Sequence, residues 1–84
     1  MRRDAVYGLI DAERNRQAEK FTGTHSWGQG DCSSLRVPKA VKAIVLAEEC
    51  GEVSRAVLDR DDAQLRDELV QVAAVAVAWL ESLP

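Results

Sequence analysis

The sequence predicts an all-α domain, an antiparallel bundle with three main helices per chain in a single unit of residues 1–84. Apolar residues recur at helical spacing in three segments, and no segment keeps the period of two that marks a half-buried strand. Glycine and serine are concentrated in one segment, and the two prolines stand at positions 38 and 84. Together these observations favour helix, long loop, helix, tight turn and helix.

The first predicted helix covers residues 4–20, where Val6, Leu9 and Ile10 lie at helical spacing and Asp4 provides a cap or a first-turn negative charge. Residues 22–38 are rich in glycine and serine and predict a loop that ends at Pro38. A loop of this length in so small a domain is uncommon unless it is functional or disordered.

Two further helices are predicted after the loop. Pro38 suits the first position of a helix over 39–58, because proline has no N–H to lose there. The polar residues 59–62 form a turn that supplies an N-cap for the last helix, over 63–83, before Pro84. A turn this short makes these two helices antiparallel neighbours.

Composition excludes several classes of protein. The net charge is −3, with 11 basic and 14 acidic residues, so no basic surface for nucleic acid is expected. The apolar stretch 69–80 falls well short of the roughly 20 residues that span a bilayer, and no secretory signal is visible. Two cysteines, Cys32 and Cys50, are too few for a disulfide framework. We therefore expect a cytoplasmic protein without membrane contact.

Glutamates interrupt the apolar faces of the last two helices. Glu49 and Glu52 lie within the apolar arc of helix 39–58, Glu48 lies at its edge, and Glu68 lies on the apolar stripe of helix 63–83. Buried carboxylates need cations. If the two faces pack together, Glu49, Glu52 and Glu68 converge, and a magnesium ion, or manganese, is the cation that oxygen ligands favour.

An alternative reading needs no metal. Glutamates on helices often pair with basic residues one turn away or on a neighbouring helix. In that case Glu48, Glu49 and Glu68 would form ion pairs, and the available partners are Lys39, Lys42, Arg55 and Arg66.

The run Glu48-Glu49-Cys50-Gly51-Glu52, followed by Glu68-Leu69-Val70-Gln71, resembles the EExxE and ExxD motifs of the MazG-like all-α nucleoside triphosphate pyrophosphohydrolases. The resemblance covers residues 44–83 most strongly. It implies a magnesium-dependent enzyme that cleaves a nucleoside triphosphate into monophosphate and pyrophosphate. It also implies that Glu49, Glu52, Glu68 and Gln71 bind the metal. Glu48 would help to hold a second ion or position the attacking water, so Glu48 and Glu49 are the candidate catalytic residues. Gln71 stands where the family usually has aspartate, and its amide oxygen binds magnesium without contributing charge.

Helix 4–20 contributes candidate substrate contacts. Glu13, Gln17 and Phe21 continue its apolar stripe, so polar groups face inward unless the helix is an amphipathic seam that frays into solvent. Residues 16–20 together with Trp27-Gly28 faintly resemble the RQ and KWG motifs of phage-type members of the family. The resemblance implies that Trp27 stacks on a base and that Lys20 or Lys42 meets a phosphate, whereas Trp27 would otherwise anchor the loop.

Assembly is expected because helix 63–83 is apolar almost all round between Leu69 and Leu80, and one partner helix cannot cover both faces. A homodimer or homotetramer would complete the bundle. The main functional hypothesis is nucleotide house-cleaning by pyrophosphohydrolysis. The alternative is a non-catalytic helical oligomer that binds nucleotide or a protein partner.

Overall fold

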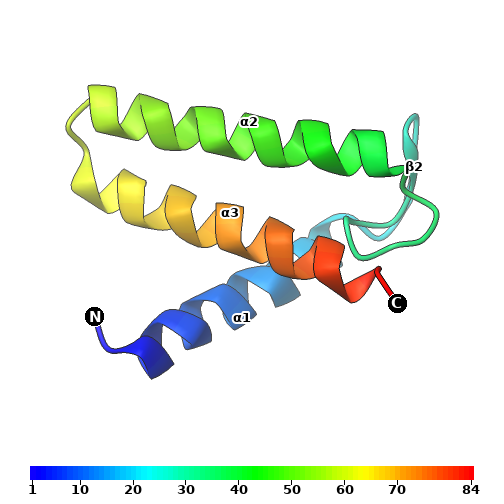
Figure 1. Ribbon diagram of the computed structural model, residues 1–84, viewed down its shortest axis with the longest axis horizontal. Coiled ribbons are helices and arrows are strands. Elements are labelled where there is room, and N and C mark those ends of the chain that lie inside the picture. Colours follow the sequence, from blue (N-terminus) through cyan, green and yellow to red (C-terminus); the bar gives the residue numbers. More distant parts are fainter.

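The computed structural model describes residues 1–84 and forms a three-helix domain, as the sequence predicts (Figure 1). The elements in chain order are α1 (Arg3–Lys20), β1 (Thr24–His25), β2 (Gly28–Gln29), α2 (Lys39–Leu58) and α3 (Asp62–Glu81). α2 and α3 run antiparallel and are joined by a short turn (Figure 1). None of the three helices combines the length and apolarity that a membrane span requires.

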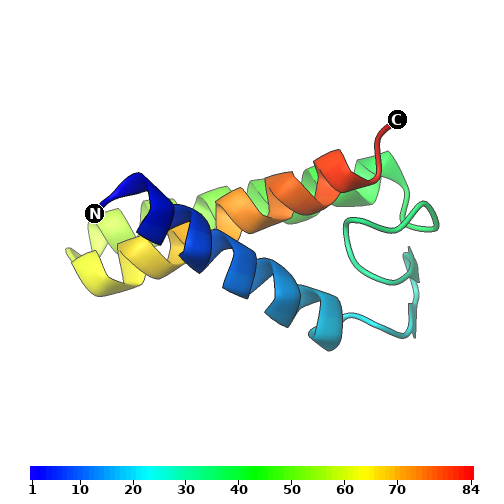
Figure 2. The same cartoon turned by 90° about the horizontal axis from the view of Figure 1, so that it is seen from below.

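α3 is the central helix of the bundle. It packs against both α2 and α1, whereas α1 and α2 do not pack against each other. α1 crosses α3 obliquely, so the two helices lie close together along only part of their lengths (Figure 1 and Figure 2). Side chains that point inward from α1 and from α2 therefore face each other alongside α3.

The helix ends follow local sequence signals with small shifts. α2 has the same bounds as the helix expected from the sequence, but Pro38 is its N-cap, with φ −62° and ψ 148°, and not its first helical residue. α3 begins one residue earlier and ends two residues earlier than expected. Its N-cap is Asp61, whose Oδ1 accepts a hydrogen bond from the Gln64 N–H at 3.0 Å. Shifts of this size are normal, because helix ends fray and caps set the boundary only locally.

The segment between α1 and α2, predicted as a loop from the sequence, contains a short hairpin. β1 and β2 pair antiparallel, with Thr24 opposite Gln29 and His25 opposite Gly28. Strands of two residues are too short to show an alternating pattern, which explains the omission. Gly28 has φ 147°, and a Cβ there would collide with the Arg36 carbonyl oxygen, so the loop folds closely upon itself only with glycine at this position.

The buried interior is small and unusually polar. The buried apolar residues are Val37, Ala56, Ala74, Val75 and Ala78, and no large side chain is fully buried. Four polar residues are also buried, namely Arg14, Gln17, Lys42 and Glu68. Buried polar groups need partners. The contacts of these four residues therefore show where polar interactions, and not only apolar packing, occur in the interior.

Candidate active site

The neighbouring helices α2 and α3 each carry a carboxylate with a buried oxygen. Glu68 of α3 is 6% exposed, and its Oε1 accepts a hydrogen bond from Gln64 Nε2 at 2.5 Å. Its other oxygen, Oε2, is buried without a hydrogen-bond partner, and so is Oε2 of Glu49 on α2. Leaving a charged group buried and unpaired costs several kcal/mol in general. The two unpaired oxygens therefore mark a place suited to a cation.

Further carboxylates surround Glu49. Burial raises the pKa of Glu49, and the negative charges of Glu68, Glu52, Glu13 and Glu48 raise it further. The side chains come from all three helices, since Glu13 belongs to α1. The sequence places Glu13 on the inward stripe of its helix, but it does not indicate that Glu13 belongs with the metal-binding residues. Only the tertiary fold brings it to Glu49.

The members of this carboxylate cluster differ in exposure. Glu48 and Glu52 are exposed, Glu49 and Glu13 are half-buried, and Glu68 is buried. Gln71 is half-buried and follows Glu68 by three residues, so it lies one turn further along a similar face of α3. No three acidic, histidine or cysteine side chains are gathered tightly enough to form a ready-made metal shell. The cluster therefore gathers negative charge, but a hard cation would have to draw the carboxylates closer together to be coordinated by them.

The alternative of ion pairing with nearby basic residues is not what the structure shows. The ion pairs join Arg2 to Asp4, Arg14 to Asp31 and Glu81, and Arg16 to Glu13. None of them involves Glu48, Glu49 or Glu68. The cation that contacts the cluster is Arg16, whose guanidinium donates to both oxygens of Glu13, at 2.9 and 2.6 Å. Glu13 is the main cause of the raised pKa of Arg16, and Glu49 is a minor one.

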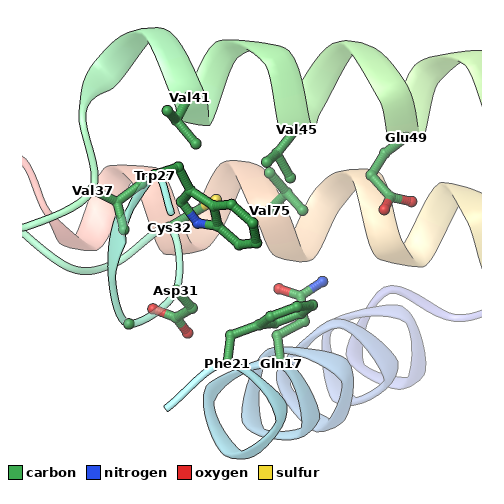
Figure 3. Close-up of a pocket in the computed structure, with 11 residues that line it drawn as sticks. Gln17, Phe21, Trp27, Asp31, Cys32, Val37, Val41, Val45, Glu49 and Val75 are labelled. Atoms are coloured by element: carbon green, nitrogen blue, oxygen red, sulfur yellow. The ribbon is translucent and has the colours of Figure 1, made fainter. Parts of the chain in front are cut away.

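A cavity of about 100 Å³ adjoins Glu49 between α1, α2 and the hairpin segment (Figure 3). Gln17 and Phe21 line it from α1, Trp27, Asp31 and Cys32 from the loop, and Glu49 from α2. Valine side chains complete its walls. The structure thus brings together three of the residues singled out from the sequence, Gln17, Trp27 and Glu49. Asp31 and Cys32 were missed, because nothing in a loop sequence indicates which of its side chains turn inward.

Aromatic rings at the cavity form a cluster of their own. The rings of His25 and Trp27 stack at a centroid distance of 4.5 Å and an angle of 7°. Phe21 meets His25 edge to face at 6.2 Å. Trp27 remains 43% exposed, and in Figure 3 its indole extends into the space between α2 and Phe21. The loop is therefore packed through these rings while leaving the indole partly open.

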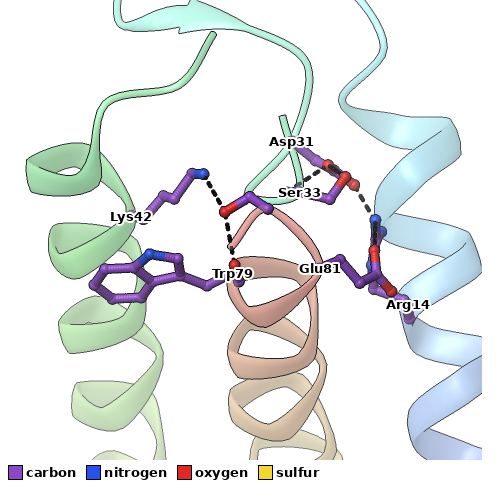
Figure 4. A network of polar contacts seen from close by, with 7 residues as sticks. Arg14, Asp31, Ser33, Lys42, Trp79 and Glu81 are labelled. Carbon is purple, nitrogen blue, oxygen red and sulfur yellow. Dashed lines mark hydrogen bonds and ion pairs between the residues drawn. The ribbon is translucent and has the colours of Figure 1, made fainter. Parts of the chain in front are cut away.

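The two predicted phosphate-binding lysines lie away from the carboxylates. Lys42 is 3% exposed and donates from Nζ to Ser82 Oγ at 2.8 Å, and that hydroxyl donates to the Trp79 carbonyl oxygen at 2.6 Å (Figure 4). Lys20 is exposed, with its Nζ 5.2 Å from the centroid of the Phe21 ring. Neither lysine lines the cavity beside Glu49.

A second, partly buried ionic cluster fixes the loop to the helices (Figure 4). Arg14 of α1 donates to Asp31 Oδ2 at 2.6 Å and to Glu81 Oε2 at 2.8 and 3.1 Å. Asp31 also accepts hydrogen bonds from the Ser33 N–H and hydroxyl. Burial pushes the pKa of Asp31 upward, but the bonds from Ser33 and the charge of Arg14 outweigh it, so the pKa lies below its usual value. This cluster holds one wall of the cavity in place.

Comparisons with protein-family models, with curated proteins and with solved structures find no match to this chain.

Proposed function

We propose that this protein is a magnesium-dependent nucleotide pyrophosphohydrolase that converts a nucleoside triphosphate into its monophosphate and pyrophosphate. The observation that supports this most directly is the pair of buried, unpaired carboxylate oxygens of Glu49 and Glu68, on adjacent helices. The resemblance of residues 48–52 and 68–71 to the MazG-like motifs agrees with it. The cavity beside Glu49 would place a substrate against the same carboxylates.

The residues suit a hard cation that keeps part of its water shell. Oxygen atoms of Glu49, Glu52, Glu68 and Gln71 would hold magnesium, and manganese has a similar preference for carboxylate ligands. When bound, the ion supplies charge neutralisation of the phosphates and lowers the pKa of its coordinated water. The three glutamates bring more negative charge than one divalent ion neutralises, and Glu48 adds to the negative charge beside Glu49, which favours additional cation density nearby.

The chemistry requires no covalent nucleophile from the chain. A water oxygen attacks the α-phosphorus, the bond from that phosphorus to the bridging oxygen breaks, and pyrophosphate leaves with the bonding electrons. Glu48 is exposed at the edge of the cluster, and its carboxylate would accept the proton that the water loses. Glu49 and Glu68 position the reacting groups by holding the cation between α2 and α3.

Assembly forms part of the proposal, because the outer face of α3 stays apolar and uncovered. Leu69 and Leu80 are 51% and 66% exposed and lie on one face of α3 at helical spacing, and Leu83, just beyond the end of the helix, is 42% exposed. Ile44, Val57 and Leu58 of α2 are also exposed. Large apolar surfaces of this kind mark interfaces. We propose that a second copy covers this face in a homodimer or a homotetramer, and that nucleotide is the only other partner.

Sedimentation velocity tests the assembly. Leu80→Glu places a charge in the exposed apolar face and is expected to shift the protein to monomer. Leu35→Glu is expected to leave the assembly unchanged, because Leu35 is an exposed leucine in the loop and not on α3. A native chain that sediments as a monomer at all concentrations would contradict an assembly through α3.

Pyrophosphate release from a panel of canonical and modified nucleoside triphosphates, with magnesium or manganese, tests the activity. Glu49→Gln and Glu68→Gln are expected to reduce release at least about 100-fold, because each removes a charged ligand of the ion. Glu19→Gln is the matched control, since Glu19 is an exposed glutamate of α1 outside the cluster. Release that is unaffected by both substitutions would exclude the carboxylate cluster as the active site.

A second candidate function is supported by Gln71 and by the absence of a ready-made metal shell. It is a helical oligomer that binds nucleotide or a protein partner without turnover. Gln71→Asp separates the two proposals, because it restores the aspartate typical of the MazG-like motif. A native chain without release that gains release on this substitution would identify a binding protein with a degenerate site.

A further inference from the structure

We propose that the outer face of α2 forms a second contact between copies of this chain, in which Arg55 of one copy pairs with Glu48 of another and two dimers join into a tetramer. The inference rests on the assembly through α3 that is proposed above, and it specifies the size of that assembly. It also brings a cation from a second copy to the candidate active site, because Glu48 is one of the negative charges beside Glu49.

The outer face of α2 consists of Ile44, Ala47, Gly51 and Leu58. Successive residues of a helix are rotated by about 100°, so these four lie within about 60° of one another, on the side opposite the buried Lys42. In Figure 1 α2 forms an edge of the molecule with α3 on its other side. All four residues are exposed, Ile44 by 58% and Leu58 by 78%. The solvent side of a surface helix is normally polar or charged, so this apolar face indicates a partner.

Gly51 stands in the middle of α2, although glycine is a poor helix former. Packing within the chain does not require it, because a Cβ at this position would meet no atom within 4 Å. Its φ is not positive, so the backbone conformation does not require glycine either. A residue without a side chain lets a second backbone approach closely. A helix of another chain that crosses α2 at Gly51 accounts for the glycine.

The apolar residues on either side of Gly51 match each other in an antiparallel pair of helices. Ile44 precedes Gly51 by seven residues and Leu58 follows it by seven, which is about 10.5 Å along the helix in each direction. If two copies of α2 run antiparallel and cross at Gly51, a twofold axis brings Ile44 of each copy against Leu58 of the other. The face is therefore complementary to a second copy of itself.

Charges complete the match along one flank of this face. Glu48 precedes Gly51 by three residues and Arg55 follows it by four, at about 60° and 40° on the same side. In the antiparallel pair, Glu48 of each copy lies level with Arg55 of the other to within about 1.5 Å. Neither residue has an ion-pair partner in its own chain, although Glu52 and Asp59 lie within about one turn of Arg55. Two reciprocal ion pairs favour a second copy over any other occupant.

The outer face of α2 is too small to hold two chains together alone. A helix of 20 residues is about 30 Å long and about 10 Å wide, so one antiparallel contact covers roughly 600 Å² on both copies together, about half of the area of a stable interface. The leucines of the first interface lie on α3, so both faces can be occupied at once. Two dimers joined through α3 would meet in two such contacts, which together reach the required area. The contact therefore forms between dimers and produces a tetramer.

The contact supplies a charge that the chain itself does not place at Glu48. The ion pairs within the chain involve none of Glu48, Glu49 and Glu68. Arg55 of the second copy would lie on the outer side of the Glu48 carboxylate, away from the interior of the bundle. A carboxylate has two oxygens, so one can accept from this guanidinium while the other stays available to the attacking water.

Native mass spectrometry without nucleotide or metal tests the contact by charge reversal. The native chain is expected to be a tetramer. Glu48→Arg and Arg55→Glu each bring like charges together twice in every contact, and each is expected to weaken the association of dimers at least about tenfold. An equimolar mixture of the two variants should recover the tetramer, because each variant offers the charge that the other needs. Glu19→Arg and Arg2→Glu change the net charge equally at exposed positions outside the face and should stay tetrameric.

Gly51→Leu tests the close approach of the helices without any change of charge. The new side chain meets no atom of its own chain, so the melting temperature should not fall. The two backbones can no longer meet at the crossing, so the tetramer should dissociate into dimers. Gly8→Leu is the matched control, since Gly8 is an exposed glycine of α1 that also has no atom within 4 Å of its Cβ position, and it should stay tetrameric.

A native chain whose largest species is a dimer would overturn the inference. The same holds for single charge reversals that stay tetrameric, and for a mixture of the two that stays dimeric. Leu80→Glu separates this contact from the one on which it rests: a native dimer that becomes a monomer on this substitution would leave the α3 interface standing and the α2 contact refuted. Pyrophosphate release is not a readout here, so a tetramer that responds as expected but releases none would support the α2 contact and count against the proposed enzyme alone.

Discussion

Two ionic clusters lie within the bundle, and they differ in whether the chain supplies its own cation. Around Arg14, one buried guanidinium contacts the carboxylates of Asp31 and Glu81. Around Glu49, one buried oxygen each of Glu49 and Glu68 has no partner, and Arg16 is paired with Glu13 instead. The first arrangement is complete in itself and fastens the loop. The second is incomplete, which is typical of sites that bind a ligand or an ion.

The largest expected effect separates the clusters by their response to magnesium. At about 100 times its dissociation constant, an ion that binds only the folded state stabilises it by about 2.7 kcal/mol. We expect magnesium to raise the melting temperature of the native chain but not that of Glu49→Gln. Arg2→Met, which changes a residue outside both clusters, is the control and should respond as the native chain does. Differential scanning fluorimetry measures this. An equal rise in the native chain and Glu49→Gln would place the bound ion elsewhere.

Removing the cation of the complete cluster should be the next largest effect. Arg14→Met leaves Asp31, whose side chain is 9% exposed, without its guanidinium and is expected to lower the free energy of unfolding by about 2 kcal/mol. Urea denaturation provides the value. Arg2→Met is the control, because Arg2 and Asp4 are 90% and 80% exposed and their ion pair contributes little. Equal stability of the two variants would mean that Arg14 does not fasten the loop.

Removing a charge from the incomplete cluster should have the opposite sign. In the absence of divalent ions, Glu68→Gln or Glu49→Gln relieves repulsion and is expected to stabilise the fold by less than about 1 kcal/mol, because solvent screens part of the interaction. The same urea denaturation measures it in buffer with a chelator. A loss of stability in both variants would show that the carboxylates already have partners in the folded protein.

The pH dependence should differ in direction between the clusters. The pKa of Glu49 is raised by folding, so its contribution is present at low pH and is lost as pH rises through the raised pKa. The pKa of Asp31 is lowered, so its contribution is present above the usual aspartate range and is lost as pH falls through the lowered pKa. Unfolding free energies measured from acid to neutral pH without metal should lose the first dependence in Glu49→Gln and the second in Asp31→Asn. A Glu49→Gln profile parallel to the native one would contradict the raised pKa.

Much of the fold was predictable, because helices depend on short-range signals. The apolar spacing of each helix, the Asp61 cap and Pro38 fix segments within a residue or two of the observed bounds. The hairpin at Thr24–Gln29 was not predictable in the same way. Its strands are too short to carry a pattern, and its shape depends on the packing of Gly28 against Arg36.

The candidate site was predictable in part. The inward placement of Glu49 and Glu68 follows from their position among apolar residues, and both have a buried oxygen in the structure. The approach of Glu13 to Glu49 depends on how α1 crosses α3. The contact of Lys42 was not visible in the sequence, because its ammonium group is bonded to Ser82, which lies 40 positions later at the end of α3.

The sequence by itself determined three helices and the presence of carboxylates on their apolar faces, because both follow from a helical period that repeats within a few residues. The tertiary structure alone decided that Arg14 meets Glu81 across 67 positions, that Trp27 stacks on His25 and that a cavity opens beside Glu49. These contacts depend on the angles at which helices cross and on the path of the loop. Many weak packing interactions set those angles together, and no single stretch of sequence encodes them.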